Sequence, residues 1–251
     1  MAAVDATEHA RWLERWDAQQ QLHIPDREER FAAIVHALAA HAGTSPKVLD
    51  LGCGPGSLSA RVLAKLPDAH VVAIDTDPVL LSIGHGALES PHLQFVDADL
   101  RRDWRSALPL APPYDAAVST TALHWLSHRD LVGFYESLAG VLRPGAVFLD
   151  GDRFDFDHDQ TVIGSVAHAV QPDWPPVDPG AEDWPAWWAA VEAEPGFAEA
   201  LLERKRRSHD HPHDNQAHSY DFHRAALLAA GFKEVGTIWQ HLVNRVVIAI
   251  R

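Results

Sequence analysis

The sequence contains one cysteine among its 251 residues, Cys53, so no disulfide bond can form within the chain. This cysteine usage is typical of proteins in a reducing compartment. Positive charge is also scarce, because 21 Lys and Arg residues stand against 35 Asp and Glu residues, a formal net charge of -14. A chain without a general positive field has little attraction for a phosphate backbone, so DNA and RNA are not expected as partners.

Long hydrophobic runs are missing as well, and the chain has no internal repeat. The first 20 residues carry charged side chains at short intervals, among them Asp5, Glu8, Arg11 and Glu14. A segment of this kind is neither a signal peptide nor a membrane span. We therefore expect a cytoplasmic protein that binds a small molecule and no membrane; the sequence carries no signal for an oligomeric state.

Short apolar segments alternate with helical patterns between about residues 46 and 150. The predicted strands are Lys47 to Leu51, Val71 to Asp75, Gln94 to Asp97, Tyr114 to Ser119 and Ala146 to Asp150. Such alternation is typical of right-handed crossovers and a parallel sheet. Near the end, the strand-like runs 234–240 and 245–250 are joined by only a few residues, which favours an antiparallel hairpin at one sheet edge.

The segment Val48 to Gly56 reads VLDLGCGPG, an apolar run that ends in an acid and three alternating glycines. Glycine lets the backbone turn tightly and approach a ligand, and a helical pattern follows directly over Ser57 to Lys65. The N–H groups that converge at such a helix start suit a nucleotide. The spacing Gly-x-Gly-x-Gly is tighter than the Gly-x-Gly-x-x-Gly of dinucleotide sites, which argues against NAD.

Acidic residues follow the next two strands. Asp75 ends the second strand, where a carboxylate about 20 residues beyond a glycine loop can accept both ribose hydroxyls of a nucleotide. Asp99 follows the third strand and is preferred to Asp97 as the acceptor for an adenine amino group. The alternatives are a helix cap for Asp75 and a turn acid for Asp99.

Together these segments resemble the motifs of the class I S-adenosylmethionine-dependent methyltransferases. The matching segments are VLDLGCGPGSLS (48–59), VVAIDTDP (71–78), FVDADL (95–100), YDAAVSTTALHWL (114–126), LRPGAVFLDGD (142–152) and AGFKEV (230–235). The Ala-Leu-His-Trp turn after the fourth strand is similar to small-molecule methyltransferases of the trans-aconitate methyltransferase type. The resemblance implies an α/β fold: a Rossmann-like three-layer sandwich with a seven-stranded, mostly parallel sheet, an antiparallel last strand and a helical cap.

The resemblance also implies which residues hold S-adenosylmethionine. The predicted cofactor-binding residues are Asp50, Gly52, Gly54, Gly56, Asp75, Thr76, Asp99, Leu100 and Ser119. In this assignment Asp50 and the glycine backbone hold the methionine part and the ribose, Asp75 holds the ribose hydroxyls, and Ser119 lies near the amino-acid group.

We expect one methyltransferase domain over residues 1–251. Helices over 5–20 and 26–41 form an N-terminal helical lid (1–42), followed by a cofactor-binding core (43–152), a cap insertion rich in Asp, His, Pro and Trp (153–215), and a C-terminal helix and hairpin (216–251). Seven of the nine tryptophans lie outside the segment 46–150. This placement predicts an aromatic cap over the C-terminal edge of the sheet, where open α/β sheets bind ligands.

Methyl transfer from a sulfonium is an in-line displacement, so the main contribution expected from the protein is alignment of the reactants. A base is needed only where the acceptor must lose a proton. His124 and Asp152 are the preferred catalytic residues because they follow the fourth and fifth strands at one sheet edge, and His223 and His241 are further candidate bases. The alternatives are a structural histidine for His124 and a turn acid or helix cap for Asp152.

The predicted acceptor-binding residues are Trp16, Trp125, Trp187, Trp188 and His223. Their aromatic character favours an aromatic or amphipathic metabolite. The alternative is that the tryptophan rings pack the cap against the core.

Two charged runs allow more than one interpretation. His209 to Asp214 contains three histidines that an extended segment would place on one side, which allows a metal site, a substrate-facing loop or a solvated loop. Because structural zinc usually recruits cysteines, no metal is predicted. The preceding run Arg204 to Arg207 either attracts an anionic acceptor or forms the solvated end of a helix.

The sequence therefore predicts a methyltransferase that uses S-adenosylmethionine to methylate an oxygen or nitrogen centre of a small molecule. One alternative is an NAD(P)-dependent oxidoreductase on a related fold. The other is a cofactor-binding protein without catalysis.

Overall fold

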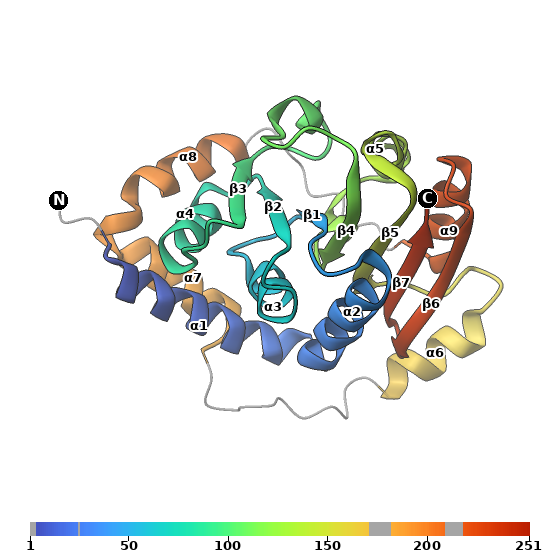
Figure 1. Ribbon diagram of the computed structural model, residues 1–251. Helices are drawn as coiled ribbons and strands as arrows, with labels where there is room; N and C mark the ends of the chain where they lie inside the picture. The colour runs from blue at the N-terminus through green and yellow to red at the C-terminus, as the bar shows by residue number, and fades with distance from the viewer. Residues whose placement is uncertain (1–3, 25, 171–181, 209–217) are drawn as a thin grey trace.

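A seven-stranded sheet forms the centre of the computed structural model, which describes residues 4–24, 26–170, 182–208 and 218–251 (Figure 1). The strand order is β3-β2-β1-β4-β5-β7-β6. The strands are β1 (Lys47–Leu51), β2 (His70–Asp75), β3 (Leu93–Asp97), β4 (Tyr114–Thr120), β5 (Leu142–Arg153), β6 (Glu234–His241) and β7 (Asn244–Ile250). All seven predicted strands are confirmed.

The sheet is parallel from β3 to β5, and β7 runs antiparallel to both of its neighbours, β5 and β6. The predicted hairpin is therefore present at one edge, with the last strand inserted next to β5 and with β6 outermost. A two-residue turn joins the pair, and Leu242 adopts a left-handed φ of 51° there. The predicted fold class is confirmed.

Helices cover both faces of the sheet. The α-helices are α1 (Ala6–His23), α2 (Arg27–Ala42), α3 (Ser57–Lys65), α4 (Pro78–Ala87), α5 (His128–Val141), α6 (Thr161–Val170), α7 (Trp184–Ala193), α8 (Ala198–Ser208) and α9 (Tyr220–Ala229). Short 3-10 helices are η1 (Trp104–Ala107), η2 (Leu123–Trp125) and η4 (Pro195–Phe197).

Alternate residues of each strand pack into two separate cores, as the period of two in a strand requires. Val48 of β1 packs with Ile34 of α2 and Val62 of α3 on one face. Leu49, its neighbour, packs with Phe134 of α5 and other side chains on the opposite face. These two cores give the three layers of the sandwich.

A third core lies at the end of the molecule where α1, α4, α7 and α8 come together (Figure 1). Its aromatic rings meet edge to face: the ring centroids of Trp12 and Trp187 are 5.9 Å apart, those of Trp16 and Trp187 5.0 Å, and those of Trp187 and Trp188 4.9 Å. Pairs in this geometry add stability beyond the area they bury. We call this cluster, with Trp184 and Phe197, the aromatic roof.

The helices of the aromatic roof belong to two segments expected from the sequence, the N-terminal lid and the cap insertion. Of the expected N-terminal lid, α1 joins the roof, whereas α2 packs on the sheet through Phe31, Ile34 and Leu38. Of the expected cap insertion, α7 and α8 join the roof, whereas α6 lies at the other end of the molecule (Figure 1). Two segments about 170 residues apart in sequence thus cover one end of the sheet, as the ion pair of Arg15 with Glu182, 167 residues apart, also shows.

Candidate functional site

A cavity of about 580 Å³ lies between the C-terminal ends of the parallel strands and the aromatic roof. Its floor is formed by the loops after β1 and β4, and one end by the loops after β2 and β3. The roof side contributes Trp16 from α1, Trp184 and Trp188 from α7, and Arg204 and Arg207 from α8. The cavity lies where open α/β sheets bind ligands.

The floor depends on a close approach between two loops at Gly52. This residue has a φ of +71°, and a Cβ atom there would lie 2.3 Å from the Cβ of Ala122 in the loop after β4. The backbone N–H groups of Gly52 and Cys53 donate to the carbonyl oxygen of Ile74 at 2.8 and 2.9 Å. Only glycine fits this conformation and this distance, so the first predicted glycine sets the shape of the floor.

The other two predicted glycines differ in their positions. Gly54 lines the cavity, and its N–H donates to Oδ2 of Asp75 at 2.7 Å. Gly56 does not line it; a Cβ there would lie 2.8 Å from the ring of Phe95. Directly after Gly56, α3 begins with Ser57, which lines the cavity together with Leu58.

Asp75 lines the cavity at the end of β2, as expected, and its neighbour Thr76 lines it too. The carboxylate accepts three backbone N–H groups, from Gly54 to Oδ2 and from Thr76 and Asp77 to Oδ1, at 2.7 to 2.8 Å. A carboxylate offers about four lone-pair positions, so capacity for a ligand hydroxyl remains on Oδ2. Burial raises the pKa of Asp75 to about 6, although these N–H groups oppose the shift.

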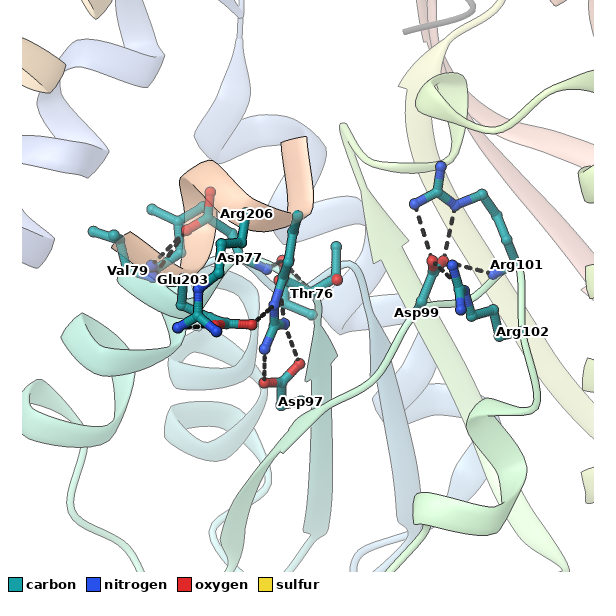
Figure 2. Close-up of polar contacts among 12 residues, drawn as sticks. Thr76, Asp77, Val79, Asp97, Asp99, Arg101, Arg102, Glu203 and Arg206 are labelled. Atoms are coloured by element: carbon teal, nitrogen blue, oxygen red, sulfur yellow. Dashed lines mark hydrogen bonds and ion pairs between the residues drawn. The ribbon is translucent and has the colours of Figure 1, made fainter. Parts of the chain in front are cut away.

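Asp99 and Leu100 also line the cavity, at the end of β3. The Asp99 carboxylate accepts two hydrogen bonds from the Arg101 guanidinium, at 2.9 and 3.0 Å, and one from the Arg101 backbone N–H at 3.0 Å, and it forms an ion pair with Arg102 at 3.5 Å (Figure 2). An adenine amino group would therefore share this carboxylate with two guanidinium groups, a feature that the sequence reading did not include.

Asp50 and Ser119 lie beneath the floor rather than in the cavity lining. Oδ2 of Asp50 accepts the Ser59 hydroxyl at 2.6 Å, and the Ser119 hydroxyl donates to the carbonyl oxygen of Leu51 at 2.7 Å. Burial raises the pKa of Asp50 to about 7. Both side chains are fully buried and tie β1 to the elements beside it.

His124 and Asp152 are brought together, although 28 residues separate them in sequence. Nδ1 of His124 lies 2.8 Å from Oδ1 of Asp152, and the imidazole lines the cavity. Burial disfavours the imidazolium, but attraction and hydrogen bonding to Asp152 outweigh it and raise the pKa of His124. Burial likewise disfavours the Asp152 carboxylate, yet His124 and the buried Arg30 hold its pKa at about 2.

The other two candidate bases do not line the cavity. His223 is buried, and its Nδ1 lies 2.6 Å from the hydroxyl oxygen of Tyr135. Burial lowers the pKa of His223 to about 3, so the ring is neutral at physiological pH. His241 of β6 contacts Asp26 instead.

The structure separates the four predicted acceptor-binding tryptophans. Trp16, Trp125 and Trp188 line the cavity, and so does Trp184, which was not among the predicted acceptor-binding residues. Trp187 is fully buried within the roof and does not line the cavity. Period and composition predict an aromatic helix but do not fix which ring faces a ligand.

Two arginines of α8, Arg204 and Arg207, bind residues at or just after the ends of β2 and β3, whereas Arg206 is exposed and pairs with Glu203 of the same helix. Nε of Arg204 lies 2.6 Å from Oδ2 of Asp77, and the guanidinium of Arg204 stacks 3.8 Å above the ring of Trp188. Arg207 donates to both carboxylate oxygens of Asp97, at 2.6 and 2.8 Å, and to the carbonyl oxygen of Thr76 at 2.8 Å. Figure 2 shows Thr76, Asp77 and Asp97 near α8, the helix that carries Glu203 and Arg206.

The histidine run 209–214 lies outside the described residues, so its metal interpretation stays open. Within the described ranges, no group of three or more His, Cys, Asp or Glu side chains is arranged to hold a metal ion. No helix there has the length and the apolar character that crossing a bilayer requires.

Sequence reasoning missed several residues of the cavity lining. These are Gln20 of α1, Ile24 directly after it and Arg27 of α2, together with Thr120 at the end of β4 and Thr121 and Ala122 after it. The last three lie inside the fourth matching motif, so a reading of the whole strand end rather than of Ser119 alone would have found them. Arg27 carried no such signal.

Comparison with known proteins agrees with this geometry. Residues 48–145 match the family model of a methyltransferase domain. The chain is 34% identical over 130 residues to a trans-aconitate 2-methyltransferase of Methylobacterium nodulans, and 34% identical over 133 residues to one of Azoarcus sp. strain BH72. These matches cover 52% and 53% of this chain, and 46% and 48% of the relatives, so the chain spans about half the length of the curated relatives it matches.

A solved structure supports the fold over nearly the whole chain. Human N-acetylserotonin methyltransferase in complex with SAM superposes with a TM-score of 0.58 and covers 98% of this chain, which in turn covers 56% of that protein. The sequences are 14% identical, so this likeness concerns the fold alone.

Proposed function

We propose that this chain, which carries a class I S-adenosylmethionine-dependent methyltransferase domain, transfers a methyl group to an oxygen or nitrogen atom of a small-molecule acceptor. The observation that carries the proposal is one cavity that joins the glycine loop and Asp75 to the His124–Asp152 pair. A cofactor at the first and an acceptor at the second would share a single cavity.

The cavity residues fit the cofactor. Gly52 and Gly54 leave the floor free of Cβ atoms, and Asp75 keeps capacity for a hydroxyl beside the N–H groups it already binds. Leu100 and Thr76 line the same end. When bound there, S-adenosylmethionine supplies an electrophilic methyl group on a sulfonium. The protein then has to orient the acceptor and exclude water, and Trp16, Trp125 and Trp188 offer apolar surface for both tasks.

His124 is the residue proposed to contact the acceptor atom. Asp152 holds Nδ1 of the imidazole, so Nε2 is left to meet a ligand in the cavity. With an acceptor that must lose a proton, neutral His124 takes that proton and the Asp152 carboxylate stabilises the imidazolium. With an acceptor that is already a carboxylate, protonated His124 donates a hydrogen bond to it instead.

A carboxylic acid is the first acceptor class to test, because the curated relatives above are named for trans-aconitate. The two roles of His124 predict opposite pH dependence. A base must be deprotonated, so the rate rises as pH passes its raised pKa, whereas an imidazolium that holds a carboxylate loses its proton and the rate falls.

The test is a pH profile of kcat/KM for trans-aconitate and for a panel of phenols and amines, measured with the unaltered chain, with His124→Asn and with His36→Gln. Asn retains an amide that can donate to Asp152 but does not titrate. His36 is exposed on α2, away from the cavity, and serves as the matched control. Loss of the pH-dependent limb in His124→Asn alone supports the proposed role; an unchanged profile overturns it. Absence of methyl transfer to any acceptor in the panel, despite binding of S-adenosylmethionine, would count against the proposed acceptor class.

A further inference from the structure

Arg27, the first residue of α2, is a buried guanidinium in the cavity lining. Its side chain is 4% exposed. Nη2 donates to Oδ1 of Asp17 at 2.9 Å, but Nη1 is buried and donates no hydrogen bond. The carboxylate of Glu28 is 3.7 Å from Nη1, beyond hydrogen-bond distance. Leaving a charged donor buried without an acceptor is costly, so a ligand oxygen at this position would be stabilising.

The guanidinium lies at the glycine-loop end of the cavity. Oδ1 of Asp17 accepts both Nη2 of Arg27 and the hydroxyl of Ser57, the latter at 2.6 Å, so the two donors lie on either side of one oxygen atom. Ser57 is the first residue of α3, and no side chain caps this helix because Gly56 precedes it. The first N–H groups of a helix have no intrahelical acceptors and carry partial positive charge. Arg27 therefore adds a full charge beside an uncapped helix start.

The other guanidinium groups of the cavity lining already bind carboxylates at or just after the ends of β2 and β3. Arg101 binds Asp99, Arg204 binds Asp77, and Arg207 binds Asp97. Among the cavity-lining arginines that the structure describes, Arg27 is the one with a buried nitrogen lacking a hydrogen-bond acceptor. An anion that enters the cavity at the glycine loop thus meets Arg27.

S-adenosylmethionine carries one anionic group, the carboxylate of its methionine part. The hydrogen bond from Gly54 to Asp75 places Asp75, the proposed ligand of the ribose, next to the glycine loop. Helix α3 begins at Ser57, three residues after Gly54. A nucleoside bound between Asp75 and Leu100 therefore directs its amino-acid tail past Gly54 toward Ser57. That tail ends in the carboxylate, at the place where the chain offers Nη1 of Arg27 and the start of α3.

We propose that Arg27 binds the carboxylate of the methionine part of S-adenosylmethionine, together with N–H groups at the start of α3. This assignment rests on the cofactor of the proposed function and is independent of the acceptor and of His124. It gives α2, which otherwise packs on the sheet, a direct part in cofactor binding.

The guanidinium is held in place before any ligand arrives. It stacks on the ring of Phe31, with 4.4 Å between its central carbon and the ring centroid, and Asp17 fixes its other edge. Asp17 keeps two partners if Arg27 is lost, because its Oδ2 accepts Nη1 of Arg61 at 2.9 Å and its Oδ1 accepts Ser57. Removing the Arg27 charge therefore leaves no unpaired carboxylate behind.

The test compares two ligands that differ only in this carboxylate, S-adenosylmethionine and decarboxylated S-adenosylmethionine. Both are titrated calorimetrically into the unaltered chain, into Arg27→Met and into Arg61→Met, without acceptor. Arg61 shares Asp17 with Arg27 but does not line the cavity, so it is the matched control. Loss of a hydrogen bond to a charged group predicts that Arg27→Met weakens binding of S-adenosylmethionine roughly tenfold to hundredfold. Binding of the decarboxylated ligand should change less than about threefold, and Arg61→Met should affect neither.

Arg27→Lys provides a second test in case Arg27→Met does not fold, because its ammonium can still pair with Asp17. It should bind S-adenosylmethionine with an intermediate affinity and leave the decarboxylated ligand unchanged, since an ammonium lacks the fork of a guanidinium. Equal weakening of both ligands in the Arg27 variants, or no weakening of either, overturns the assignment. Unchanged cofactor affinity with a raised KM for the acceptor also overturns it, and would place the acceptor at Arg27. Failure of the unaltered chain to bind either ligand would instead count against the cofactor itself.

Discussion

The close approach of Gly52 to Ala122 predicts that one added methyl group at Gly52 lowers the stability of the protein. Removing the methyl group of Ala122 should restore part of that stability. Gly52→Ala places a Cβ atom 2.3 Å from that of Ala122, in a backbone conformation with a φ of +71°. The left-handed conformation costs a non-glycine residue about 1–2 kcal/mol, and overpacking adds about 1–3 kcal/mol. We expect the free energy of unfolding to fall by about 2–5 kcal/mol, and the affinity for S-adenosylmethionine to fall with it, because both loops form the cavity floor.

The two costs can be separated by removing the opposing methyl group. In Gly52→Ala/Ala122→Gly the nearest atom to the new Cβ is the Ala122 Cα position at 3.7 Å, an ordinary contact. The double variant should therefore recover the overpacking part, about 1–3 kcal/mol, and retain the conformational part. Urea unfolding of both single variants and the double variant, followed by circular dichroism, measures this coupling. If the single effects add to within about 0.5 kcal/mol, the contact between the loops does not determine stability.

Three further predictions concern residues in the cavity lining or directly behind it. Trp188→Ala should raise the KM for the acceptor more than it changes cofactor affinity, because this ring lines the cavity. Trp187→Ala, at a fully buried position, should instead lower the free energy of unfolding by about 3–5 kcal/mol. Similar kinetics and stability in both variants would contradict the placement of the two rings. Asp75→Ala should weaken binding of S-adenosylmethionine by about 1.5–3 kcal/mol, roughly tenfold or more in a calorimetric titration, and an unchanged Kd would exclude the carboxylate as a ligand of the ribose. The pKa of Asp50 is about 7 in the folded chain, above its ordinary value, so folding takes up a proton and the stability contributed by this group falls as pH rises from about 4 to 7. In urea unfolding, Asp50→Asn should therefore lose less free energy of unfolding over that pH range than the unaltered chain. A parallel decline in both proteins would refute the raised pKa of Asp50.

Local signals in the sequence were sufficient for the strands and for the first half of the site. Lys47–Leu51 and Ser57–Lys65 have the predicted bounds because an apolar run and a glycine loop delimit both elements. Asp75 lines the cavity, as expected for an acid at the C-terminal end of a parallel strand, although Asp97 at the end of β3 does not. By contrast, β5 extends to Arg153, beyond the predicted Asp150, because β7 pairs with Asp152 and Arg153 from nearly 100 residues away.

The rest of the site depends on packing between helices that are far apart in the sequence, and local sequence patterns do not predict such contacts. Arg27 looks like an ordinary charged residue at a helix start, and only the packing of α1 and α3 around it makes it a buried cavity residue. Trp187 and Trp188 are neighbours with the same chemistry, yet contact with Trp12 and Trp16 directs one ring into the roof and leaves the other at the cavity. Ser119 and Thr120 differ in the same way, since successive residues of a strand point to opposite faces.

The aromatic roof also gives the molecule an optical label of its own. Five of the nine tryptophans, Trp12, Trp16, Trp184, Trp187 and Trp188, are gathered there, with neighbouring ring centroids 4.9 to 5.9 Å apart. Indole rings at such separations couple electronically and give a strong near-ultraviolet circular dichroism signal, and indole fluorescence changes when water reaches the ring. Any movement of α7 away from α1 would alter both signals at once. Stopped-flow fluorescence of the unlabelled protein can therefore time the arrival of a ligand beneath the roof.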